Sequence, residues 1–484
     1  MEQMPSIKKN YIMNILMNIA AVLFPLLTYP YVSRIFLPDG MGRISFAQSL
    51  VGYFNMFAQL GIPTYGIRAA AKVRDDKEKL SRTVQEILLL NLITCAISYI
   101  ALFVCIMSVR RLADMRILCV IFSTTLLFNT IGMDWFYAAL EQYSYISVRT
   151  VLLRTIMVAG IFLLIHSTDD LLLYAGLCVF MTVMTGIINL VHARKFISFQ
   201  FLGGYHPLRH LKPILMFFMM ACAQVIYTNL DTVMLGFLSG ERQVGYYSVA
   251  IKIRSTLFCV LSALVTVVYP RVSYDVERGD MEQFKKLGNH SIRYILITAA
   301  PLAVYFGIFA AVTVSVLCGP QFVPAEYSLR VVMPTVLFIG VSNVLTVQVL
   351  FPLGLEKKAL WSTITGAVID FLLNAALIPR LGAVGAGIGT LTAEFGVMVV
   401  LIIETRKYIS FREVEYGKIA VAMAAAVLGS SLLTSLLNAA WTRLVVSGFT
   451  FFGIYLAILI LLKESLCMEW LTFMRDYIKN RIKK

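Results

Sequence analysis

The sequence predicts an all-α integral membrane protein with about fourteen transmembrane helices. Of its 484 residues, 59% are hydrophobic and only 14% are charged, and the mean hydropathy is +0.79. A soluble domain is usually about 45–50% apolar and about 25% charged. Apolar runs that are long enough to cross a bilayer also recur along the whole chain. These observations exclude an ordinary soluble enzyme, a disordered protein and a secreted disulfide scaffold.

Fourteen apolar segments are candidate membrane spans, since a helix needs about 20 apolar residues to cross the hydrocarbon core. The first run extends to Phe36, which is too long for the apolar region of a signal peptide, about 7–15 residues. The least distinct boundary lies at 168–170. The predicted spans are 11–35, 44–66, 84–109, 115–140, 146–166, 170–191, 213–238, 245–269, 291–318, 329–353, 358–378, 385–404, 418–438 and 444–463.

The basic residues predict the orientation of these spans. The net charge is +15 and the isoelectric point is about 9.4, and most Lys and Arg residues lie in short gaps between apolar runs. If both termini are cytoplasmic, 30 of these residues fall on the inner side and nine on the outer side. This asymmetry is what the positive-inside rule describes, and it accounts for the basic charge without a nucleic-acid partner. We therefore expect an even number of spans and two cytoplasmic termini.

Two loops share a weak internal repeat. Residues 36–47 read FLPDGMGRISFA and residues 237–250 read FLSGERQVGYYSVA, so that a two-residue insertion aligns Gly42 with Gly245. Each segment is the outer loop between the first two spans of a six-span block, as in parallel repeats related by an axis near the membrane normal. The predicted parts are an N-terminal lobe (1–195), a C-terminal lobe (196–412), an extra pair of spans (413–463) and a basic amphipathic cytoplasmic tail (464–484).

Six segments resemble polysaccharide-biosynthesis flippases. They are PLLTYPYVSRIFLPDGMG (25–42), FAQLGIPTYGIRAAAKVRDDKEKL (57–80), DWFYAALE (134–141), NLDTVMLG (229–236), VGYYSVAIKI (244–253) and LGAVGAGIGTL (381–391). Their order and spacing resemble the oligosaccharide (O-antigen) flippases of the multidrug/oligosaccharidyl-lipid/polysaccharide exporter superfamily, over nearly the whole chain up to about residue 404. One departure is Ala139, where relatives often have Gly, and its expected effect is on packing.

The resemblance implies a fold and a function. Members of this family have two pseudo-symmetric six-helix lobes around a central cavity, often with two added helices. They move an isoprenoid-pyrophosphate-linked oligosaccharide from the inner to the outer leaflet by alternating access. The resemblance therefore implies export of a surface polysaccharide, such as O-antigen or capsule, across a bacterial plasma membrane. The polysaccharide polymerase machinery is a candidate partner, beside the membrane lipids.

Four cations are candidate ligands for the pyrophosphate. Arg34 lies near the outer end of the first span, Arg154 lies in the fifth, and Lys252 and Arg254 lie in the eighth. A charged side chain inside a bilayer costs about 2.5–3.5 kcal/mol on insertion scales, so it tends to face a cavity or a partner. Arg can hold phosphate oxygens through two parallel hydrogen bonds, and Lys provides a point charge. Arg34 and Arg154 are also close enough to an interface to extend into the head groups.

Two acids near these cations have two interpretations each. Asp231 is predicted at the same depth as Lys252 on the neighbouring antiparallel helix. The two residues therefore form either a structural ion pair or part of the ligand site. Asp134, which precedes Trp135 near the inner end of the fourth span, either fixes packing and topology or takes part in substrate binding or coupling.

Three polar residues are candidates for ion coupling. Asp370 and Glu394 lie near the middle of the eleventh and twelfth spans, where a carboxyl group suits binding and release of a proton. Asn374 follows Asp370 by four residues and shares its helical face, so the pair could bind a proton or a sodium ion. The alternative is a hydrogen-bonded carboxyl group that holds helices together.

Catalytic and cofactor motifs are absent from the sequence. There is no Walker A segment, which excludes ATP hydrolysis within this chain, and the five histidines have no metal-ligand spacing. The driving force is then an H⁺ or Na⁺ gradient, or the concentration gradient of the substrate. A flippase for the peptidoglycan lipid precursor and a drug/cation antiporter stay open as alternatives. A membrane polymerase or glycosyltransferase is a remote alternative, because such enzymes usually carry a large outer loop, so we expect a protein that is not an enzyme.

Overall fold

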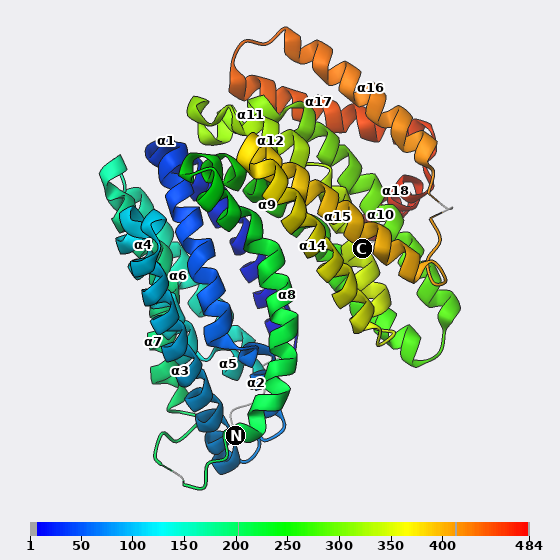
Figure 1. Cartoon of the computed structure of the whole chain (residues 1–484). Coiled ribbons are helices and arrows are strands. Elements are labelled where there is room, and N and C mark those ends of the chain that lie inside the picture. Colours follow the sequence, from blue (N-terminus) through cyan, green and yellow to red (C-terminus); the bar gives the residue numbers. More distant parts are fainter. Residues whose placement is uncertain (1–6, 202, 412–413, 483–484) are drawn as a thin grey trace. The chain divides into compact units, whose positions relative to one another are not determined.

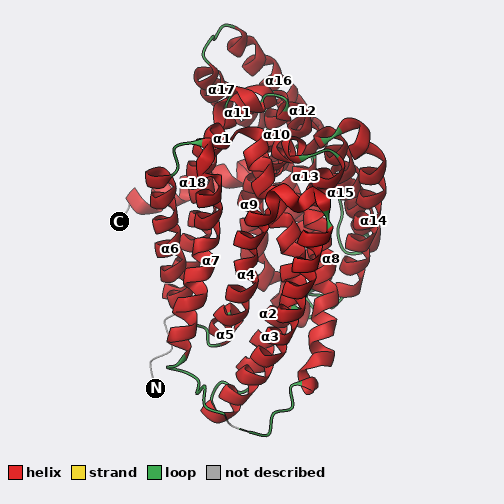
Figure 2. Ribbon diagram, turned by 60° about the vertical axis from the view of Figure 1, so that its left-hand side comes forward, coloured by secondary structure: helices red, strands yellow, loops and turns green. Residues whose placement is uncertain are grey.

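The computed structural model describes residues 7–201, 203–411 and 414–482 (Figure 1). All regular elements in these ranges are helical, as Figure 2 shows. Twelve of the described helices are long and apolar enough to cross a membrane. The chain divides into two compact units, Met1–Gly245 and Tyr246–Lys484. The predicted fold class, an all-α membrane protein with about fourteen spans, is confirmed.

The first unit is built around one long helix, α1 (Ile7–Gln59), which covers the first two predicted spans. The backbone leaves the helical conformation at Leu37 (φ 58°, ψ 178°), directly before Pro38, and a proline disfavours helical geometry at the residue that precedes it. Helix α1 packs against α3, α4, α6 and α8. The other helices are α2 (Ile62–Ala71), α3 (Lys77–Ser108), α4 (Arg116–Gly132), α5 (Asp134–Ala139), α6 (Tyr143–Leu164), α7 (Leu171–Ala193) and α8 (Leu208–Leu238), with 3₁₀ turns at Arg110–Met115 and Thr168–Asp170.

The second unit contains the remaining helices, and α9 enters it from the end of the first unit. Within it, α14 packs along α15, α10 packs on α13, and α16 pairs with α17. The helices are α9 (Glu241–Glu277), α10 (Met281–Ile308), α11 (Ala310–Cys318), α12 (Ala325–Val332), α13 (Thr335–Asn343), α14 (Glu356–Leu381), α15 (Ala383–Thr405), α16 (Tyr416–Ser435), α17 (Ala440–Leu461) and α18 (Ser465–Ile482), with a 3₁₀ turn at Pro320–Phe322 and a π-helical stretch at Val344–Leu350.

The predicted tail coincides with helix α18. Its side chains at 473, 474 and 476–482, and residues 483–484 as a whole, lie outside the described residues. The amphipathic character of the tail therefore stays a prediction, as do the lobe boundaries.

The third membrane helix of each predicted lobe begins at an aspartate cap. Asp76 accepts hydrogen bonds from the backbone N–H groups of Glu78 and Lys79, both at 3.1 Å, at the start of α3. Asp280 accepts one from the N–H of Gln283 at 3.0 Å at the start of α10. A side-chain oxygen at this position satisfies donors that have no partner inside the helix, so these caps fix where both helices begin.

The two glycines that the internal repeat aligns lie against each other's segments in the first unit. A Cβ atom at Gly42 would collide with the carbonyl oxygen of Glu241 and would lie 2.9 Å from the backbone N of Gly245. A Cβ atom at Gly245 would collide with the carbonyl oxygen of Pro38. Only glycine allows backbones to approach this closely.

A second internal repeat follows the sixth membrane helix of each lobe. Residues 194–199 read RKFISF and residues 406–411 read RKYISF. The N–H of Ser198 donates to Oγ of Ser81 in α3 at 3.0 Å, and the N–H of Ser410 donates to Oδ1 of Asn289 in α10 at 2.9 Å. Each segment thus returns to the third helix of its own predicted lobe and donates a serine N–H to a side chain there. In the first unit Gln85 of α3 adds a second contact, because its Nε2 donates to the carbonyl oxygen of Ser198 at 2.6 Å.

Candidate functional site

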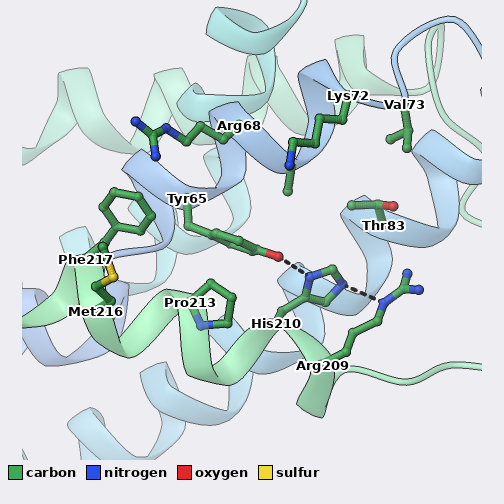
Figure 3. A pocket seen from close by; sticks show the side chains of 11 residues that line it. Tyr65, Arg68, Lys72, Val73, Thr83, Arg209, His210, Pro213, Met216 and Phe217 are labelled. Atoms are coloured by element: carbon green, nitrogen blue, oxygen red, sulfur yellow. Dashed lines mark hydrogen bonds between the residues drawn. The ribbon is translucent and has the colours of Figure 1, made fainter.

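An open pocket of about 530 Å³ lies in the first unit between α2, the start of α3 and the start of α8. Figure 3 shows Tyr65, Arg68 and Lys72, from α2 and its C-cap, above the start of α8, with Tyr65 pointing toward His210 and Arg68 lying on the side of Phe217. Segments 68–82 and 192–212 are both predicted to be cytoplasmic. With that orientation, the pocket lies at the inner surface of the membrane.

Three of the described residues that line this pocket are cations, and none of them is acidic. Arg68 and Lys72 are four residues apart, so they share one face of α2, and both are exposed. Neither forms an ion pair with a described residue. The guanidinium of Arg68 lies over the ring of Phe217 on α8, 5.3 Å from its centre, which orients the cation across the pocket.

The third cation, Arg209, is held by a buried carboxylate next to the pocket. The side chain of Glu86 is fully buried, and its Oε2 lies 2.8 Å from Nη2 of Arg209 and 2.8 Å from Nε2 of His210. Its Oε1 accepts the backbone N–H of His206 at 3.0 Å. The Nδ1 of His210 is hydrogen-bonded to the hydroxyl of Tyr65 at 2.6 Å. Because Arg209 compensates the carboxylate, the positive charge of α2 stays available to a ligand.

None of these pocket residues is among the sequence-predicted site residues, because the positive-inside rule already accounts for cations in the cytoplasmic gaps. One signal could have revealed Glu86. Thr83, Glu86, Ile87 and Leu90 have the spacing of one helical face and all are buried. A carboxylate on an otherwise buried face requires a partner, which predicts a cationic group nearby.

Asp134 lies at the start of α5 and contacts a buried arginine. Its Oδ1 is 3.1 Å from Nη2 of Arg149 on α6 and accepts a hydrogen bond from Nδ2 of Asn189 on α7 at 2.8 Å. Asn189 is fully buried, donates to the carbonyl oxygen of Gly132 at 2.6 Å, and accepts a hydrogen bond from Arg149. These contacts join α5, α6 and α7. A part for Asp134 in substrate binding or coupling stays a prediction.

The predicted pyrophosphate ligands are divided between the two units. Arg34 on α1 is exposed, and Arg154 on α6 is half-buried. Lys252 and Arg254 lie on α9 in the second unit, exposed and half-buried respectively. Nη1 of Arg154 and Nη1 of Arg254 are buried without a hydrogen-bond partner among the described residues. Asp231, on α8 in the first unit, is 6% exposed. A common site for the four cations and the predicted Asp231–Lys252 ion pair both stay predictions.

The predicted coupling residues lie on two packed helices of the second unit, α14 and α15. Asp370 and Asn374 on α14 and Glu394 on α15 are 1%, 0% and 7% exposed. A Cβ atom at Gly389 of α15 would lie 3.1 Å from Oδ1 of Asp370 and would collide with Oδ1 of Asn374. The structure therefore brings Asp370 and Asn374 to the same stretch of α15, about 7 Å along that helix from Glu394. Ion binding by these residues stays a prediction.

A helical membrane fold with ionisable groups buried inside its bundles is typical of membrane transporters, and two solved structures have a similar fold. One is the lipid II flippase MurJ in an inward closed conformation, with a TM-score of 0.76, 12% sequence identity, and coverage of 94% of this chain and 99% of that chain. The other is an inward-facing multidrug resistance MATE family transporter of the MOP superfamily. Its TM-score is 0.58 at 15% identity, and the match covers 80% of this chain and 93% of that one.

The chain belongs to the polysaccharide biosynthesis protein family, whose model matches residues 7–274. A relative from Escherichia coli strain K12, which is named as an O-antigen transporter, is 23% identical over 392 residues. The match covers 80% of this chain and 94% of that protein. The family that the six sequence segments indicated is therefore confirmed.

Proposed function

We propose that this chain is a flippase that moves an isoprenoid-pyrophosphate-linked oligosaccharide from the inner to the outer leaflet by alternating access. The family match over residues 7–274 carries the proposal. The relative named as an O-antigen transporter supports export of a surface polysaccharide as the purpose. The similarity to a lipid flippase, which extends over 94% of this chain, shows a fold suited to that task.

The pyrophosphate of the substrate is assigned in this proposal to four cations, Arg34, Arg154, Lys252 and Arg254. The half-buried Arg154 and Arg254 each keep a guanidinium nitrogen without a hydrogen-bond partner among the described residues, which favours a role toward an anion. Guanidinium groups bind phosphate oxygens in a fork geometry, and the missing partners cost free energy until a ligand supplies them.

The energy source in this proposal is an H⁺ or Na⁺ gradient, bound at Asp370, Asn374 and Glu394. The burial of all three side chains supports this assignment, since oxygen ligands inside a bilayer are costly unless they bind a cation or one another. The concentration gradient of the lipid-linked substrate is the alternative driving force.

The proposal places the protein in a bacterial plasma membrane with both termini in the cytoplasm. In that position the chain delivers its lipid-linked cargo to the polysaccharide polymerase machinery on the outer side and carries out no covalent chemistry itself. The basic segments 68–82 and 192–212 support this orientation through the positive-inside rule.

Deletion of the gene in its host tests the proposal. We expect isoprenoid-linked repeat units to accumulate in the inner leaflet while surface polysaccharide disappears, and the wild-type gene should restore export. Arg34→Ala and Lys252→Ala should each lower the export rate roughly tenfold or more, because a hydrogen bond to a charged group contributes about 1.5–3 kcal/mol. Arg43→Ala, at another exposed residue of α1, is the matched control and should export normally.

Three further results would contradict parts of this proposal. Unchanged lipid intermediates together with altered drug sensitivity would favour the antiporter alternative, and loss of peptidoglycan synthesis would favour the peptidoglycan precursor as substrate. Asp370→Asn and Glu394→Gln separate the driving forces. If both variants export at the wild-type rate with an unchanged pH dependence, these residues do not couple transport to an ion gradient.

A further inference from the structure

The pocket of the first unit has the charge of an anion-binding site. Arg68 and Lys72 extend from one face of α2, and Arg209 lies across the pocket on α8 (Figure 3). The contact of Arg209 with Glu86 uses Nε and Nη2, so its Nη1 remains available to a ligand. A fork-shaped guanidinium and a compact ammonium are the side chains that phosphate oxygens prefer.

One wall of the same pocket is apolar. Pro213, Met216 and Phe217 line it from α8, and Met216 is 66% exposed. Helix α8 is long and apolar enough to span a membrane. This wall therefore continues into an exposed apolar surface of α8, which includes Leu215 and Met219, while the cations lie at the level predicted for the inner head groups. A ligand that satisfies both walls carries an anionic head group on a hydrocarbon tail.

The pocket is held open by contacts between its walls. Gly61, at the N-cap of α2, has φ +72°, and a Cβ atom there would lie 2.5 Å from the backbone N of Phe218 on α8. Glycine at this position lets the two backbones touch. On the other side, the Tyr65–His210–Glu86 hydrogen-bonded chain ties α2 to α8 and α3. Fixed walls reduce the ordering that binding would otherwise require.

We propose that this pocket binds the phosphate-bearing head group of a lipid in the inner leaflet. The ligand is an amphiphile with a phosphate or pyrophosphate on a hydrocarbon tail. The isoprenoid-pyrophosphate carrier and an anionic phospholipid both supply this chemistry. Only the choice of the carrier as occupant rests on the proposed function. For that occupant, the pocket is a loading position on the cytoplasmic side.

Binding to the purified full-length chain in detergent tests this proposal. The probes are undecaprenyl pyrophosphate without sugar, phosphatidylglycerol and inorganic pyrophosphate, with affinity followed by native mass spectrometry. The test variant is Arg68→Gln/Lys72→Gln. The control Arg194→Gln/Lys212→Gln removes the same charge from two exposed residues that do not line the pocket. Arg68→Lys/Lys72→Arg keeps the charges and shows that the fold tolerates substitution there.

We expect the test variant to bind the lipid phosphates at least tenfold more weakly, while the control and the charge-conserving variant stay within about twofold. Preference for undecaprenyl pyrophosphate would identify the carrier as the occupant, and equal binding of phosphatidylglycerol would identify lipid phosphate in general. An equal loss in the control, no loss in the test variant, or equal affinity for inorganic pyrophosphate would overturn the proposal. A deletion strain with normal polysaccharide would refute the proposed function and leave this binding result intact.

Discussion

The two units anchor the same helix of their repeat with opposite charges. In the first unit α3 buries an acid, Glu86, which contacts the cations at the start of α8. In the second unit the counterpart α10 carries a cation, Arg293, whose side chain is 13% exposed. Arg293 lies 3.5 Å from Glu415, just before α16, and also pairs with Glu464, just before α18. In each unit, these contacts join the third helix of a predicted lobe to the segment that follows the sixth helix of that lobe.

The sign of the charge that each unit buries determines which charged side chains are drawn to it from the surface. The acid of the first unit draws in Arg209 and leaves a pocket lined with cations. The arginine of the second unit uses acids that lie at both ends of the α16–α17 pair, so its contacts hold the two extra helices against α10. The first unit thus has a surface that is suited to an anionic ligand, whereas the second unit has a site that attaches the two extra helices.

Of the variants that test this difference between the units, Arg293→Met should lower the stability most. It leaves the side chain of Glu464, which is 1% exposed, without its partner. Removing one member of a buried ion pair costs about 3–5 kcal/mol. We expect a lower unfolding temperature in detergent and faster proteolysis of the segment before α16. Arg271→Met, at an exposed residue of α9, should change neither, and an equal effect of both variants would refute the anchoring role.

Glu86→Ala should destabilise the first unit somewhat less, by about 2–3 kcal/mol, because His210 and the N–H of His206 lose a buried acceptor. Arg209 is 52% exposed and can turn to water. Glu86→Gln keeps an acceptor and should cost less than the alanine variant. Thermal unfolding with tryptophan fluorescence measures both. A glutamine variant as unstable as the alanine variant would mean that charge, rather than hydrogen bonding, holds this cluster.

Each repeated segment should respond to the loss of the side chain that accepts its serine N–H group. Ser81→Ala removes the acceptor for the N–H of Ser198, and Asn289→Ala removes the acceptor for the N–H of Ser410. Each change should cost about 1 kcal/mol and should accelerate amide hydrogen exchange in its own segment only. Faster exchange in both segments from either variant would contradict the independence of the two anchors.

Acid should slightly weaken the contact between Arg293 and Glu415 in the second unit. The hydrogen bond from Lys418 lowers the pKa of Glu415, assisted by the N–H of Ser465 and the charge of Arg293, while burial acts in the opposite direction. A carboxyl group whose pKa is lowered by folding stabilises the folded state at neutral pH and loses that contribution as the pH falls through its folded pKa, which lies below that of a free glutamate. Proteolysis before α16 should therefore increase in acid, and Glu415→Gln should reduce this pH dependence.

Hydropathy was sufficient to predict the membrane helices, because burial in lipid demands long apolar segments whatever their packing. The break at Leu37 falls where the sequence separates the first two spans, and the following proline explains it. The site was harder to predict. Glu86 lies near the predicted cytoplasmic end of a span, where a charge has no visible cost in the sequence, and its partners come from a segment about 120 residues later. The RKFISF and RKYISF repeats are short enough to miss without the matching backbone contacts.

The contact between Gly42 and Gly245 has a consequence for the evolution of this family. The internal repeat aligns these two glycines of α1 and α9, and each segment occupies the space that a side chain on the other would need. Neither segment can therefore acquire a larger residue at its glycine, or shift its register, without displacing the other. Among relatives, we expect these two positions to vary together. Covariation between two positions that lie about 200 residues apart in the sequence would then reflect this one contact between backbones.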